Sequence, residues 1–325
     1  MKSHNILITG GAGFIGSHLA EMVIASGARV TIADNLRRDS YANIQHIRKS
    51  VRFLNVDLTT LEGALEATRG QDVVFNLAAI NTGIDFDIGR TQYMFEENML
   101  LQMQPLRAAG INKVKKFIQV SSASIYSRQA MEKHVPTKET DDQEEPEPSK
   151  LGYALAKKMG EKMAMWYSQN TPLYTVIARP INVYGPRDHF DTMGHFIPIV
   201  IRKFIRAKKE VEIYGSGRQK RSFLYVLDLI EALYLLMKKG GNGEIYNIDS
   251  HDEHSVKEIV YSVQKNMNLS RVSINFNTSL PEGSKRRLLD NQKITSLGWK
   301  PNHILFNELP GIIRDIQKRY ATENN

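Results

Sequence analysis

The chain lacks cysteine entirely and has no long apolar run among its 325 residues. Without a thiol, disulfides, thiolate zinc sites, iron–sulfur clusters and a cysteine nucleophile are all excluded. The most apolar stretch, residues 223–237, contains Asp228 and Glu231 and is too short to cross a bilayer, so we expect an amphipathic helix there. A strand-like run already starts at Asn5, so we expect no signal peptide. These absences predict a cytoplasmic protein without membrane contact.

Negative charge is scarce relative to positive charge. The chain has 43 Lys and Arg residues against 35 Asp and Glu residues, which gives a net charge of +8. Such a balance favours anionic partners, whether nucleic acid, a membrane surface or a phosphorylated small molecule. The basic residues are scattered, so we expect no nucleic-acid binding. The histidines show no metal-ligand spacing, so we predict no metal site.

Short β-branched runs alternate with helical patterns through the first half of the chain. This alternation predicts an α/β fold with a Rossmann-type, doubly wound parallel sheet. The strands are expected at 5–10, 29–34, 51–57, 72–79, 115–122 and 174–180, with helices at 14–26, 91–109 and 151–169. After Pro180 the pattern changes, and we expect a helix at 198–209, a strand that becomes a helix at 221–236, a strand at 243–249 and a last helix at 308–320.

This change of pattern predicts two domains. The Rossmann-type domain would take residues 1–179 and about 222–250, and a smaller C-terminal α/β domain for the substrate would take residues 180–221 and 251–325. One segment, residues 128–150, departs from the alternation of strands and helices because it is polar, acidic and contains three prolines. We expect a solvated loop there, with a lid over the substrate as the alternative.

The sharpest local signal is the sequence TGGAGFIG at residues 9–16, which follows an expected strand and opens an expected helix. Gly10, Gly13 and Gly16 allow a tight turn and a close approach of the backbone to a pyrophosphate, which the N-terminus of the helix would bind. Asp34 ends the next strand and can accept hydrogen bonds from both ribose hydroxyls, which favours NAD over NADP. Arg37 and Arg38 follow closely and would suit the 2′-phosphate of NADP, which is the alternative. Asp57 is a candidate partner of the adenine amino group or, alternatively, a simple helix cap.

The second signal combines Tyr153 and Lys157 in the sequence YALAK with Ser122 at the end of an expected strand. On a helix, positions i and i+4 share a face, so the lysine ammonium would lie beside the phenol. An adjacent cation lowers the pKa of a tyrosine toward the range that a general base needs. The carboxyl ends of parallel strands are where such sheets place their sites, so the serine hydroxyl can hold the reacting oxygen.

The motifs TGGAGFIG, NLAA, SSASIY, YALAK, RPINVYGPR, RSFLYVLD and LGWKP appear in one order along the chain. In this the chain resembles the extended short-chain dehydrogenase/reductases that act on nucleotide sugars. The resemblance implies a bound NAD, a nucleotide-diphosphate sugar as substrate, and a homodimer formed through the helices at 91–109 and 151–169. It also implies that Ser122, Tyr153 and Lys157 form the catalytic group, and that Asn98 braces Lys157 through water. The implied cofactor contacts are Gly10, Gly13, Phe14, Ile15, Gly16, Asp34, Asn35, Asp57, Leu58, Leu77, Ala78, Ala79, Asn98, Tyr153, Lys157 and Pro180. The implied substrate contacts are Asn182, Arg187, His195, Arg221 and Arg286.

The residues after Ser122 separate the branches of this family. Ala123 and Ser124 stand where the 4,6-dehydratases carry an Asp-Glu pair and the glucuronate decarboxylases a glutamate, so both reactions are disfavoured. The stretches at 78–87, 185–198 and 285–290 look most like GDP-fucose synthase and GDP-mannose 3,5-epimerase. In that branch His195 would be an acid, but Ser124 replaces the partner cysteine and is a poor base for carbon deprotonation. We therefore expect epimerisation of an NDP-hexose through oxidation at C4, with an epimerase-reductase or a dehydratase as alternatives.

Overall fold

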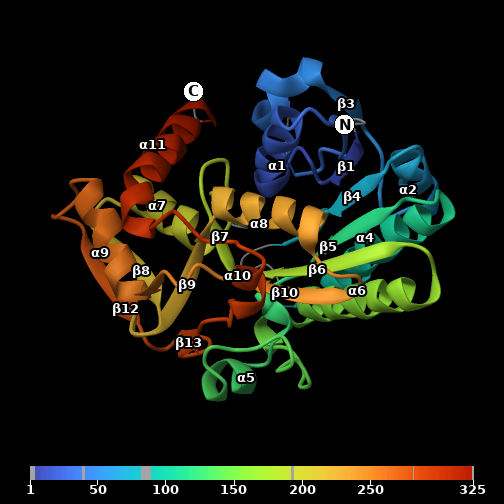
Figure 1. The fold of residues 1–325 in the computed structure, drawn as a ribbon. Helices are drawn as coiled ribbons and strands as arrows, with labels where there is room; N and C mark the ends of the chain where they lie inside the picture. Colours follow the sequence, from blue (N-terminus) through green and yellow to red (C-terminus); the bar gives the residue numbers. More distant parts are fainter. Residues whose placement is uncertain (1–3, 39–40, 82–88, 192–193, 281, 324–325) are drawn as a thin grey trace.

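The computed structural model describes residues 4–38, 41–81, 89–191, 194–280 and 282–323. Its centre is a seven-stranded parallel sheet with the strand order β10-β6-β5-β4-β1-β2-β3 (Figure 1). The strands are β1 (Asn5–Thr9), β2 (Arg29–Ala33), β3 (Val51–Leu54), β4 (Val73–Asn76), β5 (Lys116–Val120), β6 (Tyr174–Pro180) and β10 (Glu244–Ile248). The predicted Rossmann-type sheet is confirmed. Strands β2 and β3 lie on one side of β1, whereas β4 and the later strands lie on its other side, so the strand order reverses between β1 and β4. Sheets of this type bind their ligands at the point where the strand order reverses.

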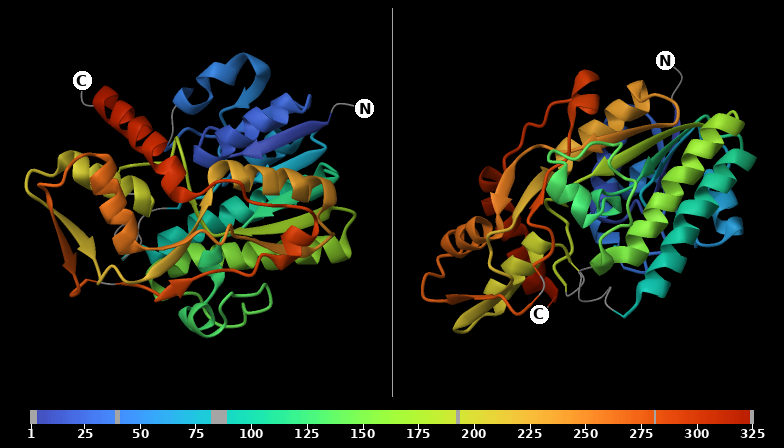
Figure 2. Two further views of the ribbon diagram at one scale, coloured as in Figure 1. Left: turned by 60° about the vertical axis from the view of Figure 1, so that its left-hand side comes forward. Right: turned by 90° about the horizontal axis from the view of Figure 1, so that it is seen from below.

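Helices cover both faces of this sheet (Figure 2). They are α1 (Phe14–Ala25), α2 (Leu61–Thr68), α4 (Thr91–Ile111), α6 (Leu151–Asn170) and α8 (Val226–Lys239), with a 3₁₀ helix η1 (Tyr41–Ser50) before β3. Successive strand residues point to opposite faces, so Ile6 and Ile8 enter the core under α1 and α8, whereas Leu7 enters the core under α2, α4 and α6. Both faces of each strand are thereby buried, which explains the continuously apolar runs in the sequence.

The smaller unit has its own core beside the carboxyl ends of the central strands. A four-stranded sheet and a two-stranded sheet pack against α7, α9 and α11, and residues such as Phe204, Ile259 and Ile312 fill the space between them. The elements are β7 (Asn182–Tyr184), α7 (Phe196–Arg206), β8 (Glu210–Tyr214), β9 (Lys220–Tyr225), β11 (Glu253–Ser255), α9 (Val256–Asn266), β12 (Ser273–Asn277), β13 (Arg286–Arg287) and α11 (Leu305–Glu323), while α10 (Gln292–Ser296) returns to β10. The predicted boundaries between the two domains remain a prediction.

The expectation of a solvated loop at 128–150 is correct only in part: many of its residues are exposed, but the segment is anchored to the interior. This segment contains α5 (Arg128–Lys133) and η3 (Pro148–Lys150), and Thr137, Asp142 and Glu147 are buried. The buried guanidinium of Arg179 binds it directly, since its Nη2 lies 2.6 Å from Asp142 Oδ2 and its Nη1 donates to the carbonyl of Glu139. Asp142, one of the acidic side chains that suggested exposure, is therefore a partner of an interior group, whereas others such as Glu145 are exposed.

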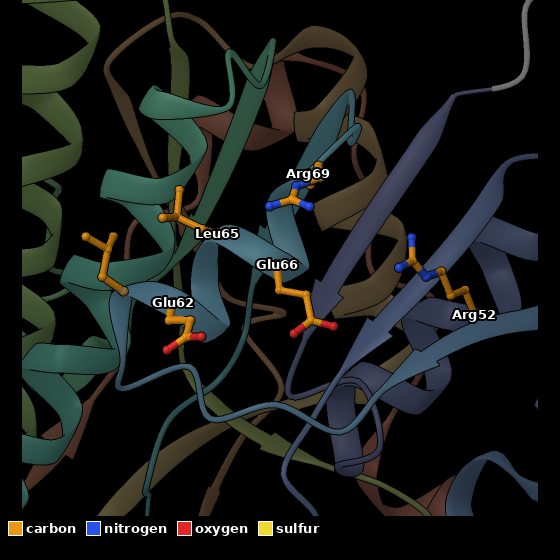
Figure 3. A pocket seen from close by; sticks show the side chains of 6 residues that line it. Arg52, Glu62, Leu65, Glu66 and Arg69 are labelled. Carbon is orange, nitrogen blue, oxygen red and sulfur yellow. The ribbon is translucent and has the colours of Figure 1, made fainter.

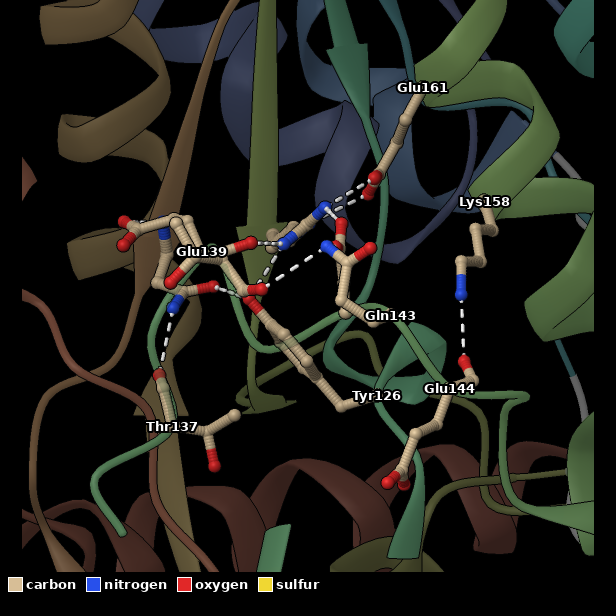
Figure 4. A network of polar contacts seen from close by, with 11 residues as sticks. Tyr126, Thr137, Glu139, Gln143, Glu144, Lys158 and Glu161 are labelled. Atoms are coloured by element: carbon tan, nitrogen blue, oxygen red, sulfur yellow. Dashed lines mark hydrogen bonds and ion pairs between the residues drawn. The ribbon is translucent and has the colours of Figure 1, made fainter. Parts of the chain in front are cut away.

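Figure 4 shows how this network joins the segment to the central sheet. Arg179 also forms a bidentate pair with Glu161 on α6, at 2.9 and 2.6 Å, and donates to the hydroxyl of Tyr126. Tyr126 in turn donates to Asn247 on β10, whose amide donates to the carbonyl of Thr137. A bidentate pair with further charge-assisted bonds is the arrangement that makes a buried cation tolerable. The segment is thus anchored to α6, β6 and β10.

Candidate functional site

The glycine turn joins β1 to α1 and leaves a cradle that side chains would fill. Gly10 has a φ of +64°, and a Cβ there would lie 3.0 Å from the Cα of Ala78. A Cβ on Gly16 would overlap the carbonyl oxygen of Gly10. Gly13 precedes α1 without a side-chain cap, so the first-turn N–H groups and the positive end of the helix dipole are directed at the turn. The cradle fits the pyrophosphate of a dinucleotide.

Asp34 lies at the end of β2, beside this cradle. Its carboxylate accepts from the N–H of Ala12 at 3.0 Å and from the N–H of Leu36 at 2.9 Å. Burial raises the pKa of this carboxyl, and the two N–H donors oppose that rise. Arg37 binds Glu97 at 3.1 Å, and Arg38 donates to the carbonyl of Asn81. Both arginines thus already bind other groups of the chain, which fits a ribose with free hydroxyls better than a 2′-phosphate.

The remaining residues expected to contact the cofactor lie around the same edge. The N–H groups of Leu77 and Ala78 donate to the hydroxyl of Thr9, which fixes the chain after β4 next to the turn. Asp57 is exposed and accepts from the N–H and hydroxyl of Thr59, whereas the side chain that caps α2 is that of Thr60, so Asp57 is not the helix cap that was the alternative to an adenine contact. The others occupy the neighbouring strand ends and the start of α1: Phe14, Ile15, Asn35, Leu58, Ala79 and Pro180.

Tyr153 and Lys157 lie one turn apart on α6, as the spacing predicts, and Tyr153 is buried. Two lysines lie near the Tyr153 ring: the Nζ of Lys157 is 5.8 Å and the Nζ of Lys150 is 5.9 Å from the ring centroid. Lys157 Nζ donates to the carbonyl of Val120 at 2.7 Å. Burial lowers the pKa of this ammonium to about 7, and the charge of Glu161 counteracts part of that shift. The arrangement places a titratable cation beside the phenol.

Ser122 follows β5 and begins the 3₁₀ turn η2 (Ala123–Ile125), which packs against α6. Its hydroxyl accepts from the N–H of Ser124 at 3.1 Å and donates to the Ser124 hydroxyl at 3.2 Å. The turn therefore holds the serine at the strand end, on the side where α6 carries Tyr153. No carboxylate follows Ser122 in this turn, which consists of Ala123, Ser124 and Ile125.

Asn98 lies on α4, and its side chain contacts the chain that follows β4. Its side chain accepts from the N–H of Ile80 at 2.9 Å and donates to the Ile80 carbonyl at 3.0 Å, so it pins the chain after β4. The side chain that reaches Lys157 from α4 is Gln102, whose Oε1 lies 3.3 Å from Nζ. Gln102 follows Asn98 by one helical turn, and that spacing is the signal in the sequence that could have identified it.

His195 belongs to a chain of polar contacts that leads back to Tyr153. Its Nδ1 lies 2.8 Å from the buried carboxylate of Asp188, and the amide of Asn81 is 3.0 Å from its Nε2. The Oδ1 of Asn81 accepts from Lys150 at 3.0 Å, next to the Tyr153 ring. Because the amide nitrogen donates to Nε2, the network assigns the imidazole proton to Nδ1. Sequence reasoning missed Asp188, which stands seven positions before the histidine.

Three of the expected substrate residues, Asn182, Arg221 and Arg286, lie on strands of the four-stranded sheet of the smaller unit. Asn182 on β7 donates to the carbonyl of Ser222 at 2.8 Å. Arg221 on β9 is held by the carbonyls of Lys220 and Glu282. Burial and the neighbouring Arg287 lower the pKa of Arg221 to about 9. A guanidinium that is desolvated next to a second cation is a favourable place for a phosphate.

Two of the expected arginines lie elsewhere. Arg286 is exposed and forms a bidentate pair with Glu253, at 2.6 and 3.0 Å, whereas its neighbour Arg287 is the residue paired in register with Arg221. Arg187 lies against α1, where its Nη2 is 2.6 Å from Glu21. The structure thus brings Arg287 rather than Arg286 to Arg221.

A surface groove lies at the far edge of the sheet, between α2 and β3 (Figure 3). Arginines and glutamates line it together, and three strands separate β3 from β5, the strand that Ser122 follows. Among the described residues, no group of three or more His, Asp or Glu side chains is arranged to hold a metal ion. In the same part of the chain, no helix is both long and apolar enough to span a bilayer.

Comparison with known proteins agrees with this geometry. The model of the family "NAD dependent epimerase/dehydratase family" matches residues 6–249. UDP-N-acetyl-alpha-D-glucosaminuronate decarboxylase of Bacillus cytotoxicus is 34% identical over 80% of this chain and 79% of its own. GDP-mannose 3,5-epimerase of Arabidopsis thaliana is 31% identical over 91% and 78% of the two chains. The structure of UDP-glucose 4-epimerase from Thermotoga maritima superposes with a TM-score of 0.85 at 26% identity, over 97% of this chain and 99% of the other.

The glycine cradle, the acidic strand end and the Ser-Tyr-Lys group therefore occur in a chain whose sequence matches one family over three quarters of its length. The protein belongs to the NAD-dependent epimerase/dehydratase family of extended short-chain dehydrogenase/reductases, and NAD is its cofactor.

Proposed function

We propose that the protein is a nucleotide-sugar epimerase that oxidises an NDP-hexose at C4 and returns the hydride to the keto sugar. The observation that carries the proposal is the composition of the site around Tyr153. A phenol with two lysines within 6 Å of its ring centroid lies near the β5 end, where Ser122 is followed by Ala123 and Ser124 rather than by an acid. Such a site can remove and replace a hydroxyl proton, but that turn holds no carboxyl group for eliminating water.

In this mechanism the bound NAD supplies the hydride acceptor and donor. Tyr153 takes the proton of the sugar hydroxyl at its Oη, while the Ser122 hydroxyl holds the same sugar oxygen. Lys157 supplies the positive charge that favours the phenolate. Asp34 holds the adenosine ribose of the cofactor, so the reacting groups stay aligned for transfer in both directions.

The diphosphate of the substrate would bind to Arg221 together with Arg287. Their register across β9 and β13 places them on one face of the small sheet, and burial together with repulsion from Arg287 lowers the pKa of Arg221, both of which a bound anion would offset. Asn182 on the neighbouring β7 would contact the sugar or the nucleotide. Arg286, which the sequence suggested for this role, is paired with Glu253.

The His195–Asp188 pair supports a second candidate reaction. A keto group at C4 acidifies the protons on the adjacent ring carbons, and an imidazole that is oriented by a buried carboxylate is suited to move such a proton. The product would then be a ring epimer, with an epimerase-reductase as the extended version of this reaction. Ser124 offers no matching base, so we rank this candidate second.

One experiment separates these reactions. The purified protein is incubated in D2O with UDP-, GDP-, CDP- and dTDP-hexoses, including a hexuronate, and the products are analysed by NMR. Interconversion of C4 epimers without deuterium in the ring supports the proposal. Deuterium at a carbon adjacent to C4 supports the His195 reaction instead. Release of carbon dioxide from the uronate, or loss of water, would overturn the proposal in favour of decarboxylase or dehydratase activity.

Replacement of Tyr153 by Phe tests the role of the phenol. We expect kcat to fall by about 10²–10⁴-fold, because the proton of the sugar hydroxyl loses its acceptor. Retention of NAD and the melting temperature should change little, since the buried ring remains. Tyr261→Phe, on an exposed tyrosine of α9, is the matched control. Full activity of Tyr153→Phe would show that another group accepts the proton.

We also propose that two copies associate through α4 and α6, and that the enzyme acts in the cytoplasm. The two helices run side by side along one face of the molecule (Figure 2), and Met159 and Trp166 of α6 remain exposed there. Residues seven apart lie on one helix face, so these two apolar side chains form a stripe. An exposed apolar stripe of this kind suits a second copy of the same surface.

A further inference from the structure

The ammonium of Lys157 is enclosed between α6, β5 and α4. The residue is 2% exposed, and Nζ donates to two oxygens, the backbone carbonyl of Val120 at 2.7 Å and Oε1 of Gln102 at 3.3 Å. Both acceptors are neutral. An ammonium has three N–H donors and no acceptor, so two are used by these oxygens and the third is left for the side of Tyr153.

Gln102 is itself held by a string of buried polar side chains under the sheet. Gln119 on β5 donates through Nε2 to the same Oε1, and Gln119 Oε1 accepts from Asn76 Nδ2 at 3.3 Å. Asn76 Oδ1 accepts from the hydroxyl of Thr9 at 2.8 Å, and Thr9 ends β1 just before the glycine turn. All four of these side chains are fully buried. The string fixes which end of the Gln102 amide faces Lys157, since Nε2 of Gln102 is already bonded to the carbonyl of Asn98.

The charges that face Lys157 are few. On its own helix, Tyr153 lies one turn before it and Glu161 one turn after it. The carboxylate of Glu161 is shared with Arg179 of β6 in the bidentate pair, which reduces its effect on the lysine. From β5 the neighbour is the Val120 carbonyl, and from α4 it is the Gln102 amide. Because the carboxylate of Glu161 is shared with Arg179, the two neutral acceptors carry much of the remaining stabilisation of the buried ammonium.

We propose that Gln102 is a positioning residue for catalysis. Its amide oxygen, oriented by Gln119, stabilises the charged form of Lys157 and holds Nζ in its position near the Tyr153 ring. The inference rests on the proposed roles of Tyr153 and Lys157. It explains why a glutamine, rather than an apolar residue, occupies a fully buried position on a helix that packs against α6.

Two isosteric changes test the proposal through the pH profile of kcat/KM. Gln102→Leu removes the acceptor, so the alkaline limb, where Lys157 loses its proton, should move to lower pH by roughly one to two units. Gln102→Glu places a carboxylate at the same point and should move that limb to higher pH. Gln104→Leu is the matched control, because Gln104 lies two residues further along α4, on the opposite face of the helix. Its profile should match that of the parent protein.

Thermal unfolding gives a readout that does not depend on turnover. Lys157 binds its proton less tightly in the folded than in the unfolded protein, so its protonation lowers stability at pH values below the folded pKa, and that loss fades as pH rises. Gln102→Leu should increase this loss of stability, because the protonated lysine then lacks one of its acceptors. Its deficit in Tm against the parent should therefore be larger at about pH 5.5 than at about pH 8.5. The deficit of Gln104→Leu should be the same at both values.

Shifts of the alkaline limb in the same direction for both Gln102 variants, or a Tm deficit that does not change with pH, would overturn the proposal. If Gln102→Leu does not fold, Gln102→Glu and Gln119→Leu give the same two readouts. Lys157→Met separates the proposed catalytic role of Lys157 from the proposed positioning role of Gln102. A fully active Lys157→Met would refute the proposed catalytic role, whereas an inactive one together with unshifted Gln102 profiles would refute the role of Gln102 alone.

Discussion

Gly16 lies where the chain enters α1, against the carbonyl oxygen of Gly10. Replacing it with alanine would force the turn to open, because the new Cβ overlaps backbone rather than a movable side chain. We expect Gly16→Ala to retain at least tenfold less NAD after purification and to lose roughly 1–3 kcal/mol of stability. The measurements are the NAD released per mole of denatured protein and a denaturant titration.

Gly311→Ala is the control for this change. Gly311 lies on α11, where an added Cβ meets its nearest atom, at the end of a flexible arginine, at 4.0 Å. That variant should keep its NAD and be as stable as the parent or slightly more so, since alanine favours a helix. Equal NAD retention by the two variants would contradict the role of the turn in cofactor binding.

Single residues differ in how well their role in the site can be predicted from the sequence. The glycine turn and the Tyr153–Lys157 pair could be predicted because their geometry is set within one turn of chain. The choice between Arg286 and Arg287 could not, because neighbouring strand residues point to opposite faces and the register of β13 depends on its pairing with β9. Gln102 escaped notice for a similar reason, since Lys157 reaches it across 55 positions of sequence.

At the scale of elements, the segment 128–150 depends on anchors that it does not itself contain. Asp142 binds Arg179 at 2.6 Å, so Asp142→Ala removes one of the charge-assisted bonds that hold the segment to β6. We expect trypsin to cleave this segment about tenfold faster in the variant, because local opening becomes less costly. Limited proteolysis under native conditions, with the fragments identified by mass, measures this rate.

Glu145→Ala provides the comparison within the same segment, because Glu145 is exposed. It should be cleaved at the rate of the parent protein. If Asp142→Ala were cleaved no faster, the segment would be held by its other contacts, and the bond to Arg179 would be redundant.

Elements with a strong internal pattern were predicted to within a few residues. The helix expected at 91–109 runs from Thr91 to Ile111, and the one at 151–169 runs from Leu151 to Asn170. The anchoring of the segment 128–150 was not predicted, because its composition indicates exposure. The arginine that binds the buried Asp142 lies on β6, outside the segment. The short strands β11 and β13 have too few residues to show any period, and they form only by pairing with β9.

For the whole molecule, the exposed stripe on α6 gives a direct test of the proposed dimer. Trp166→Glu places a charge on this stripe, and burying it between two copies would be strongly unfavourable. We expect the variant to elute as a monomer in size-exclusion chromatography with light scattering, while the parent elutes as a dimer. Ile304→Glu, which changes an equally exposed apolar residue away from α4 and α6, should leave the assembly unchanged. A dimeric Trp166→Glu would place the interface elsewhere.

The burial of Lys157 has a consequence for the reactivity of its amine toward carbonyl compounds. An amine whose pKa is lowered to about 7 is a strong nucleophile near neutral pH, and such amines condense with carbonyl compounds. The proposed reaction generates a ketone within the same site. Because the residue is only 2% exposed and its Nζ donates to the Val120 carbonyl and to Gln102, the amine is poorly accessible to that ketone. The packing that depresses the basicity of the lysine thus also protects the enzyme from forming an imine with its own intermediate.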